Sequence, residues 1–589
     1  MSELANKAAA LAWRATGALT WRDAHALAWS ALALALLALV AATGEWVWFA
    51  PGRSRAIARS AAVARLVGSA DRRLRLAAVE QAALLRSGEL SSVELVDLSV
   101  AQLEAVDREL NLLVGERFSA ARLEARAADA ALSRARRAGP AALAQLPPLL
   151  GVPMITKEVH AYPGFPYTMG LVRLAGRVAA LKNPALARLE RAGAIVLACG
   201  NTSEACMWAE SANYVHGVSS NPYDASRTVG GSSGGTAAAA AALGGAFAVT
   251  SDVGGSTRIP SLYCGMFGHK PSGGAIPNCR SIPVVHGKVE RFCQLGPCAR
   301  SARDLFPLLR LMAGPSRTDE LVGAEDAELR RHAEQRPWMR EFAWPEPRAA
   351  DVQRLRLFVV WEQPGAEFGL VSPRHAAMVA AQARAVAALE RRTGRAVERV
   401  RLDKMDRCFD IWGAALQTAN PVAFAKVISE GKPREVSPVM ELAKWLLTGG
   451  HGSDHTLPAI ALALTENLAK LTPQRNKELD KLNSALRDEI NALLGNDGVL
   501  LFPSLPTPAP THGPLPNLLR FADYAACGIF NTLELPATAV PMGLSDEGLP
   551  TGLQIVAANG CDHLTIATAL ALEEDGAARW EPPRFVVTA

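Results

Sequence analysis

A run of almost wholly apolar residues, ALAWSALALALLALVAA, covers residues 26–42. After three residues a tryptophan-rich stretch, WVWFA, follows at 46–50. Together the two stretches reach the ~20 residues that a helix needs to cross a bilayer, and tryptophans are typical of the membrane interface. The pattern predicts a transmembrane helix over 26–50, preceded by a short segment over 1–25. A cleaved signal peptide and a buried alanine-rich helix are the alternatives.

Basic residues are unevenly distributed around this predicted helix. Arg53, Arg55, Arg59 and Arg65 follow it closely, whereas the basic residues that precede it are sparser. Because Lys and Arg accumulate on the cytoplasmic side of a span, the asymmetry predicts a single-pass, membrane-anchored protein with a cytoplasmic main domain. Residues 51–75 are rich in Arg and Ala and predict a linker helix that leads away from the membrane.

Helical periodicity dominates the next stretch of the chain. Behind Ser91 and Ser92, either of which can serve as an N-cap, apolar residues return every three or four positions. A second helical pattern ends on Gly139-Pro140, a typical helix stop. Residues 76–137 are therefore predicted to be helical throughout.

The pattern changes at Leu149, where short apolar runs begin to alternate with helical segments. The runs have the length and the flanking residues of buried strands. Since this alternation is typical of a sheet covered by helices, the sequence predicts an α/β fold and one catalytic domain over 76–589. Strands are expected within 149–159, 192–201, 244–256, 355–362, 498–504 and 549–557, and residues 300–495 are expected to be mostly helical.

Composition and charge narrow the class of protein. Of the 589 residues 49% are hydrophobic, the net charge is only +5, and no Lys/Arg cluster is dense, so a nucleic-acid partner is not expected. The nine cysteines form no C-x-x-C pair, so neither a disulfide framework nor a zinc site is expected. Free thiols fit a reducing compartment. No metal or other cofactor is expected.

Two adjacent serines lie in the glycine-rich stretch TVGGSSGGT at 228–236. Around Ser232 the stretch satisfies G-x-S-x-G, the nucleophile elbow of α/β-hydrolases. That elbow needs a strand leading directly into the serine, but here the polar, turn-rich SSNPYDASRT precedes it. It also needs a downstream acid and histidine, and neither His512 nor His563 has a context that marks it. The α/β-hydrolase interpretation is therefore disfavoured.

Another serine, Ser256, follows an expected strand and the pair Gly254-Gly255. Consecutive glycines let backbone N–H groups converge on one point, so a serine there would have an oxyanion hole beside it. Upstream, Lys157 ends an apolar run; burial favours the uncharged form of a lysine, which is a competent base. Each signal has a plain alternative: a glycine-rich turn with a capping serine, and a surface lysine at a strand end.

Taken together, these stretches resemble the amidase signature family. The resemblance rests on GVPMITKE around Lys157, GGSSGG around Ser232 and SDVGGSTRIP around Ser256, and it covers roughly residues 76–575. LLRSGELSSVELV and LPATAVPMGLSDEGLPTGLQIVA also fit the family. Within it, SEACMWAESANYVHGVSSNPYDASRTVGGSSGG and GMFGHKPS are most similar to the fatty acid amide hydrolase branch, in particular its second mammalian type, and this chain looks like a bacterial relative.

The resemblance implies the amidase signature fold, a mixed twisted central sheet with helices on both faces, and a Ser-Ser-Lys triad. Ser256 matches the family's nucleophile, Ser232 its bridging serine, often behind a cis peptide bond, and Lys157 its base. No histidine is needed. The oxyanion would be bound by the backbone N–H groups of four residues: Val253, Gly254, Gly255 and Ser256.

Supporting roles are expected for four further residues. Ser233 either hydrogen-bonds Lys157 or caps the following helix. Asp252 and Arg258 are expected to form a structural ion pair that holds the glycine turn. Cys206 falls where the family lines its acyl pocket, although a small buried thiol is equally ordinary in a core.

The implied function is a membrane-associated serine amidase. Its substrate would be a hydrophobic acyl amide, such as a fatty acid amide or an N-acyl ethanolamine, cleaved through an acyl-enzyme to a carboxylic acid and an amine. Membrane lipid is the second expected partner. The alternative enzyme is a broad-specificity amidase, carbamate or ester hydrolase of small aryl or polymer-derived substrates; an amidotransferase subunit is disfavoured by the predicted span. The head group, the chain length and the oligomeric state, including a homodimer, stay open.

A second membrane contact is suggested by residues 436–450. Apolar residues recur there at helical spacing, beside Lys444 and Trp445. An apolar face flanked by Trp and Lys is typical of an interfacial helix, but the same spacing fits a helix packed on the core. Both interpretations stay open. The apolar positions are Val439, Leu442, Ala443, Leu446 and Leu447.

Overall fold

A computed structural model describes residues 53–584, apart from residue 286 and the segments 314–342, 366–370, 420–421, 431–434, 470–472, 514–516 and 518–519. The predicted transmembrane helix over 26–50 and the segment before it lie outside the described residues. None of the helices within the described part is long and apolar enough to cross a membrane.

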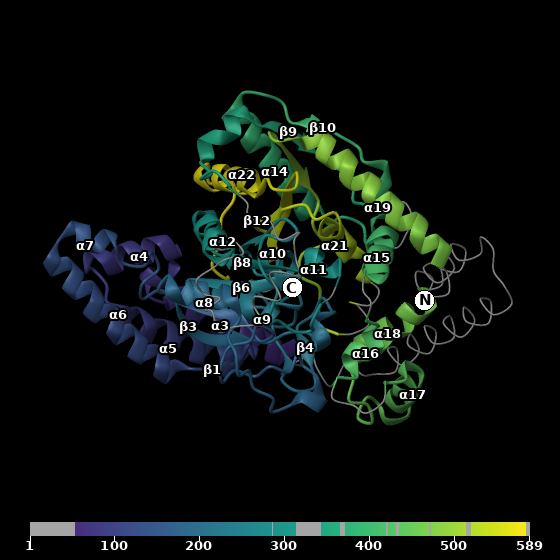
Figure 1. The fold of residues 1–589 in the computed structure, drawn as a ribbon, viewed down its shortest axis with the longest axis horizontal. Helices are drawn as coiled ribbons and strands as arrows, with labels where there is room; N and C mark the ends of the chain where they lie inside the picture. The colour runs from purple at the N-terminus through teal and green to yellow at the C-terminus, as the bar shows by residue number, and fades with distance from the viewer. Residues whose placement is uncertain are drawn as a thin grey trace.

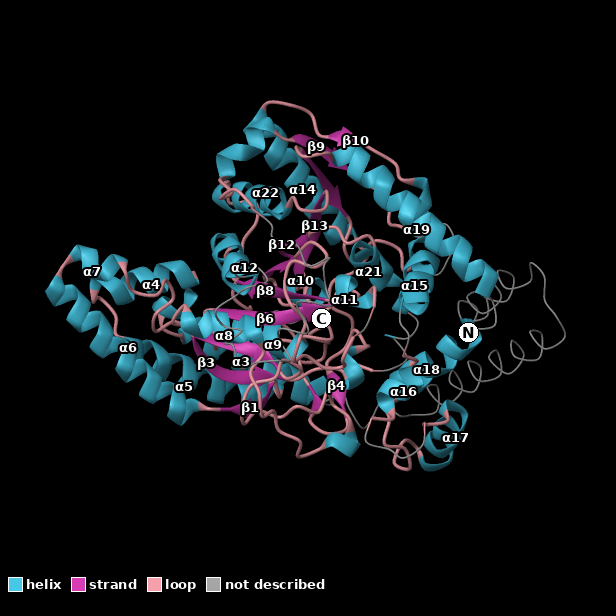
Figure 2. Ribbon diagram, in the orientation of Figure 1, coloured by secondary structure: helices cyan, strands magenta, loops and turns pink. Residues whose placement is uncertain are grey.

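A mixed sheet forms the centre of the fold (Figure 2). Among the described residues it has eleven strands in the order β1-β3-β2-β6-β8-β7-β12-β13-β11-β9-β10. The strands β3, β2 and β6 are parallel, whereas β6, β8, β7, β12, β13 and β11 alternate in direction. The predicted α/β class and the mixed central sheet are confirmed. The bounds are β1 Leu113–Glu116, β2 Pro153–Lys157, β3 Ile195–Gly200, β6 Phe247–Asp252, β7 Phe267–Lys270, β8 Gln294–Ala299, β9 Arg356–Val359, β10 Glu398–Arg399, β11 Gly498–Phe502, β12 Ala537–Leu544 and β13 Pro550–Ala557, with a separate pair, β4 Ala212–Asn213 and β5 Gly217–Val218.

The six predicted strand regions each contain an observed strand, but other strands escaped prediction. The expectation that 76–137 is helical throughout is wrong, because β1 interrupts it and pairs antiparallel with β3. Strand β8 was not predicted because it contains Gly296 and Pro297, two residue types that are uncommon inside strands. A Cβ on Gly296 would collide with the carbonyl oxygen of His269, so the glycine is required by the close approach of β7 and β8.

Helices at the amino-terminal end of the described chain pack against the sheet domain (Figure 1). Ser91 is the N-cap of α5, its side chain accepting a hydrogen bond from the Glu94 N–H, and Gly139 ends α6 as expected. The predicted Arg-rich helix over 51–75 corresponds to α3, Arg53–Ser69, and the 3-10 helix η2, Arg72–Arg75. Besides linking, α3 packs on the domain: Val63 and Val67 are buried, and Ser60 Oγ accepts from the Ala225 N–H at 2.8 Å.

Most of the remaining helices cover the sheet, and three others form a group of their own. Figure 1 shows α16, α17 and α18 grouped at the lower right, across the molecule from α4 and α7. The α-helix bounds are α4 Ala78–Ser87, α5 Ser92–Leu110, α6 Phe118–Ala138, α7 Pro140–Ala144, α8 Pro184–Arg191, α9 Gly234–Ala241, α10 Arg258–Tyr263, α11 Val289–Phe292, α12 Leu305–Ala313, α14 Ala376–Thr393, α15 Cys408–Ala419, α16 Phe424–Ile428, α17 Pro438–Thr448, α18 Leu457–Ala469, α19 Pro473–Leu494, α21 Ala525–Thr532 and α22 Asp562–Glu574. The other 3-10 helices are η3 Val172–Leu174, η4 Glu204–Cys206, η5 Ala302–Asp304, η6 Ala349–Arg354, η8 Asp403–Arg407 and η9 Phe521–Tyr524.

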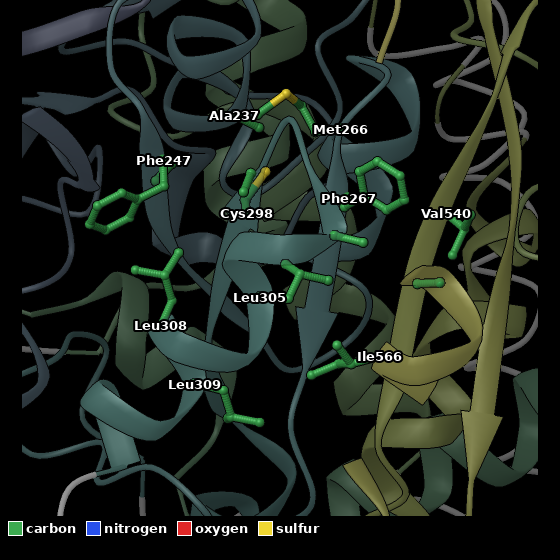
Figure 3. Packing of buried hydrophobic residues seen from close by; sticks show 14 of the residues in the cluster. Ala237, Phe247, Met266, Phe267, Cys298, Leu305, Leu308, Leu309, Val540 and Ile566 are labelled. Atoms are coloured by element: carbon green, nitrogen blue, oxygen red, sulfur yellow. The ribbon is translucent and has the colours of Figure 1, made fainter. Parts of the chain in front are cut away.

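The main core lies where the sheet meets these helices. Phe247 of β6 and Phe267 of β7 are fully buried, and Leu305 and Leu309 of α12 belong to the same cluster (Figure 3). The all-buried alanine helix α9 packs on β2, β3 and β6. Small side chains allow this helix to approach the sheet closely, which fixes the glycine-serine stretch that precedes it.

The predicted apolar face of α17 is divided between core and surface. Leu442 and Trp445 are buried in a small cluster with Leu457 and Ile460 of α18. By contrast Val439, Met440 and Leu447 are exposed, at 64%, 58% and 86%. The helix is therefore packed through one side and presents apolar residues on the other.

Candidate active site

The candidate site lies at the edge of the sheet where two parallel strands end. In the parallel pair β2 and β6, Thr156 lies opposite Val249, so both strands deliver their carboxyl ends to the same edge. Lys157, the last residue of β2, is fully buried. Its Nζ lies 2.7 Å from Ser232 Oγ and 3.1 Å from Ser251 Oγ. The alternative of a surface lysine at a strand end is thus wrong.

The glycines of GGSSGG make room for the serine next to this lysine. A Cβ on Gly231 would lie 2.7 Å from the Glu210 nitrogen, and one on Gly230 would lie 2.9 Å from Pro260 Cα. The loop therefore passes between the segment that contains Glu210 and helix α10, where only glycine fits. The Gly231–Ser232 peptide bond is cis, as the resemblance implies.

Beyond β6 the chain turns through Val253-Gly254-Gly255 to Ser256, and Asp252 holds this turn. Its Oδ1 accepts from the Gly255 N–H at 2.7 Å, and its Oδ2 accepts from the Thr257 N–H at 3.1 Å and from Arg258 Nε at 3.0 Å. Burial alone would raise the pKa of Asp252, but the charge and hydrogen bonds of Arg258 outweigh it and hold that pKa below its usual range. The expected ion pair is present.

Arg258 ties the turn to the other half of the sheet. Its Nη1 donates to Gln554 Oε1 of β13 at 2.8 Å, and its Nη2 donates to Asn531 Oδ1 of α21 at 2.7 Å. Asn531 in turn donates to the carbonyl oxygen of Asp252 at 2.9 Å. Because every one of these groups is buried, the network fixes the backbone of the turn rigidly.

Ser256 stands at the end of this turn with 8% of its surface exposed. Gly255 before it has φ 108°, a backbone conformation that favours glycine. No hydrogen bond joins Ser256 to Ser232 or to any other side chain in the part of the chain that the structure describes. The structure thus brings Lys157 and Ser232 into contact and places the Ser256 hydroxyl at the end of a fixed glycine turn.

Ser233 occupies the N-cap position of α9, in line with one of its two expected roles, but its side chain hydrogen-bonds neither that helix nor Lys157. Its Oγ donates to the Ser251 carbonyl oxygen at 3.3 Å and makes no cap hydrogen bond to α9, and Lys157 contacts Ser251 in its place. The contact of Ser251 with Lys157 was missed by sequence reasoning, because it depends on the register of β6 against β2. No local sequence signal reports that register.

An aromatic cluster beside the glycine turn was also missed. The ring of Trp412 from α15 lies against Gly254, whose Cβ, if present, would be 2.8 Å from Trp412 Cζ2. Trp412 also contacts Phe521 with ring centroids 5.9 Å apart, and Phe521 stacks on Trp208 at 5.5 Å. Phe409 completes the cluster, edge-on to Phe521. Three distant segments meet here, so no single stretch of sequence reveals the cluster.

Cys206 lies in the 3-10 helix η4. It is nearly buried, in an apolar cluster with Val159, Met169 and Ile282. Its Sγ is 3.5 Å from Thr202 Oγ1. This environment fits both expectations, a pocket wall and an ordinary core position.

Comparison with known proteins places the chain in a family. The amidase family model matches residues 94–566. Similar proteins include fatty-acid amide hydrolase 2-B from Danio rerio, 38% identical over 506 residues that cover 85% of this chain and 89% of that protein. Fatty-acid amide hydrolase 2 from Homo sapiens is 36% identical over 510 residues, again 85% and 89% of the two chains.

A solved structure, 6-aminohexanoate cyclic dimer hydrolase complexed with substrate, has a TM-score of 0.65 and covers 87% of this chain and 99% of its own. At 24% identity this likeness bears on the fold alone. The family model spans most of the described domain, and the lysine, the two serines and the glycine turn lie inside the matched residues. The chain therefore belongs to the amidase signature family and is an amidase.

Proposed function

We propose that this amidase is a membrane-associated serine hydrolase of hydrophobic acyl amides, such as fatty acid amides and N-acyl ethanolamines. The observation that carries the proposal is the 2.7 Å contact between buried Lys157 Nζ and Ser232 Oγ beside the glycine turn that ends in Ser256. The substrate class is supported by the similarity to two fatty-acid amide hydrolases over 85% of the chain.

The first chemical step forms an acyl-enzyme. Uncharged Lys157 accepts the proton of the Ser232 hydroxyl while Ser232 accepts the proton of Ser256, and Ser256 Oγ attacks the amide carbonyl carbon. The carbonyl π pair moves onto oxygen, and backbone N–H groups of the turn from Val253 to Ser256 stabilise that charge. Asp252 contributes indirectly, since its hydrogen bonds hold the turn in place.

The second step releases the amine. Since an amide anion is a poor leaving group, the nitrogen must be protonated as the C–N bond breaks. Lys157 returns the proton through Ser232 to that nitrogen. Water then attacks the acyl-ester carbon, with the same serine-lysine pair accepting its proton, and the carboxylic acid leaves with Ser256 restored.

Two apolar clusters would bind the substrate. The cluster around Cys206 would take the acyl chain, and the aromatic cluster of Trp208, Phe409, Trp412 and Phe521 would line the space beside Gly254. Burying the methylene groups of a substrate chain contributes about 0.8 kcal/mol each, so a long acyl chain supplies the binding energy that positions its amide for attack.

The membrane anchor is part of the same proposal. A span over 26–50 would hold the catalytic domain at the cytoplasmic face of a membrane, where hydrophobic amides dissolve. The exposed Val439, Met440 and Leu447 of α17 would touch the lipid as a second contact.

A second candidate function is hydrolysis of small aryl amides, carbamates or esters. The aromatic cluster beside Gly254 favours it, because planar rings stack well on tryptophan and phenylalanine. A substrate panel separates the two: N-acyl ethanolamides of increasing length, N-acyl taurines, primary amides and aryl carbamates. A value of kcat/KM that rises with acyl length supports the lipid amide function. A value that peaks on aryl carbamates and falls with length supports the second, and Ser256→Ala is the control for catalysis at this site.

A further inference from the structure

One loop in the site carries two buried carboxylates, each paired with a histidine from a distant part of the chain. This site loop, residues 203–211, packs against Gly231 through Trp208 and Glu210. Glu204 Oε1 lies 2.7 Å from His455 Nδ1, and Glu210 Oε1 lies 2.6 Å from His512 Nδ1. All four side chains are buried. An ionised carboxylate is left strongly destabilised if its buried partner is removed, so both pairs hold the loop.

The first pair joins the site loop to the hairpin of α17 and α18. His455 lies in the connection between these two helices, and the other oxygen of Glu204 accepts from the Thr456 N–H at 2.7 Å, just before α18 begins. Trp445 of α17 donates through Nε1 to Tyr214 at 3.2 Å. Leu442 and Trp445 belong to an apolar cluster separate from the main core, while Ala463 of α18 lies in the same cluster as Cys206. Polar contacts and this apolar packing together fix the hairpin to the site.

The loop next to Glu204 has an uncommon backbone. Ala205 and Cys206 have φ 50° and 60°, values that a residue with a side chain keeps only when its surroundings enforce them. The Ala205 N–H donates to the Met169 carbonyl oxygen at 2.8 Å, and the Met169 N–H donates to Glu158 Oε2 at 3.0 Å. Glu158 directly follows Lys157. A continuous chain of bonds therefore runs from the hairpin to the residue beside the proposed base.

We infer that Glu204 and His455 are positioning residues that hold the Ala205–Cys206 turn and couple the α17–α18 hairpin to the acyl side of the candidate site. This inference rests on the proposed function for what the turn contacts. Neither residue takes part in bond making. When the pair is intact, the turn presents Cys206 to the acyl chain in one fixed geometry; when it is broken, the turn relaxes and a long chain loses that wall.

The second pair supplies a matched control. Glu210–His512 is likewise a buried carboxylate–histidine pair, with a contact of 2.6 Å against 2.7 Å for Glu204–His455, and it acts on the same loop. His512, however, comes from the segment that follows β11 and not from the hairpin. A general loss of loop stability would follow from breaking either pair. Loss of the coupling between the hairpin and the acyl side of the site would follow only from breaking Glu204–His455.

The test compares His455→Ala with His512→Ala on a butanoyl and a hexadecanoyl amide. For His455→Ala we expect KM for the long amide to rise about tenfold, the factor that corresponds to a lost charge-assisted hydrogen bond, with KM for the short amide unchanged. His512→Ala should leave the ratio of the two KM values as it is in the wild type. His455→Asn, whose amide nitrogen can replace Nδ1 as the donor, should restore the long-chain KM.

Amide hydrogen exchange gives a readout that needs no substrate. Exchange at Ala205 and Cys206 should accelerate in His455→Ala and not in His512→Ala. If His455→Ala does not fold, Glu204→Gln, which keeps the shape and removes the charge, is compared with Glu210→Gln in the same two measurements. Equal changes in both members of the matched pair would overturn the inference. A wild-type protein inactive on both amides would instead contradict the proposed function, while exchange would still decide whether the pair positions the turn.

Discussion

Trp412 lies against Gly254 so closely that a methyl group on Gly254 would sit 2.8 Å from the ring carbon Cζ2. Gly254 is in the turn proposed to bind the oxyanion, and Trp412 also packs on Gly528 of α21, so the ring has little room to withdraw. The shape of the turn thus depends on a side chain more than a hundred and fifty positions away in the sequence.

We expect Gly254→Ala to lower kcat by about a hundredfold, the loss typical of a displaced oxyanion donor, because the new methyl group pushes the turn away from Trp412. The double variant Gly254→Ala, Trp412→Phe should recover much of that loss, since the smaller ring removes the clash. A double-mutant cycle measured on kcat decides the matter. Simply additive effects of the two substitutions would show that the contact does not control the turn.

The roles of the two adjacent serines can be separated by paired substitutions. Ser256→Ala should abolish turnover, and Ser232→Ala and Lys157→Met should each lower kcat by several orders of magnitude, as members of one catalytic unit do. Ser233→Ala is the matched control and should change kcat little, because the hydrogen bonds of Ser233 Oγ within the described chain go to the Ser251 backbone. A fluorophosphonate followed by peptide mapping should label Ser256. Labelling of Ser232, with activity retained in Ser256→Ala, would show that Ser232 and not Ser256 is the nucleophile.

Features that lie in one short stretch of sequence could be predicted, whereas contacts between distant segments could not. Lys157, Ser232 and Ser256 were identifiable because each lies in a contiguous stretch with its own glycines or strand. Ser251 was not, because its contact with Lys157 depends on strand register. The contact of His455 was not predicted either, since its partner Glu204 lies far away in the sequence and no local pattern links a buried His to a buried Glu.

The packing of the Arg-rich helix on the catalytic domain was not predicted from the sequence. The Arg-rich helix before residue 72 has the composition of an exposed linker, yet Val63 and Val67 are buried and Ser60 accepts from Ala225. Helix α3 has only a narrow apolar side, so its overall composition does not indicate that it packs on the domain.

Stability should depend on pH through Lys270, which is buried at the end of β7 and donates to the Pro271 carbonyl oxygen. Burial, with a smaller contribution from Arg258, lowers the pKa of Lys270 to about 7, whereas a lysine in the unfolded chain keeps about 10.4. Between these values the unfolded chain binds more protons than the folded one, so the free energy of unfolding rises with pH, by at most about 1.4 kcal/mol per pH unit.

Urea unfolding from about pH 7 to about pH 9 measures this slope. Relative to Lys270→Met, which has no proton to lose at this position, the wild type should gain stability as the pH rises. Lys288→Met is the control, because the Lys288 side chain is 67% exposed, and it should keep the wild-type slope. Parallel curves for the wild type and Lys270→Met would mean that Lys270 is not the titrating group.

The exposed face of α17 should bind membranes without the predicted span. A chain that begins at Arg53 lacks residues 26–50 but keeps α3 and its buried contacts, so it should fold. We expect it to bind liposomes through Val439, Met440 and Leu447, because these apolar residues are exposed on one helix next to Lys444 and an apolar face beside a cation suits the lipid interface.

Val439→Glu with Leu447→Glu should release the protein and slow hydrolysis of long-chain amides more than short ones. Leu446 is left unchanged since it packs in the cluster with Trp445. The control is Leu123→Glu on α6, because Leu123 is equally apolar and 63% exposed and helix α6 lies across the molecule from α17 (Figure 1). It should not alter binding. Cosedimentation with the Arg53 chain gives the answer: binding that persists in the α17 double variant, or that Leu123→Glu reduces equally, would exclude α17 as the contact.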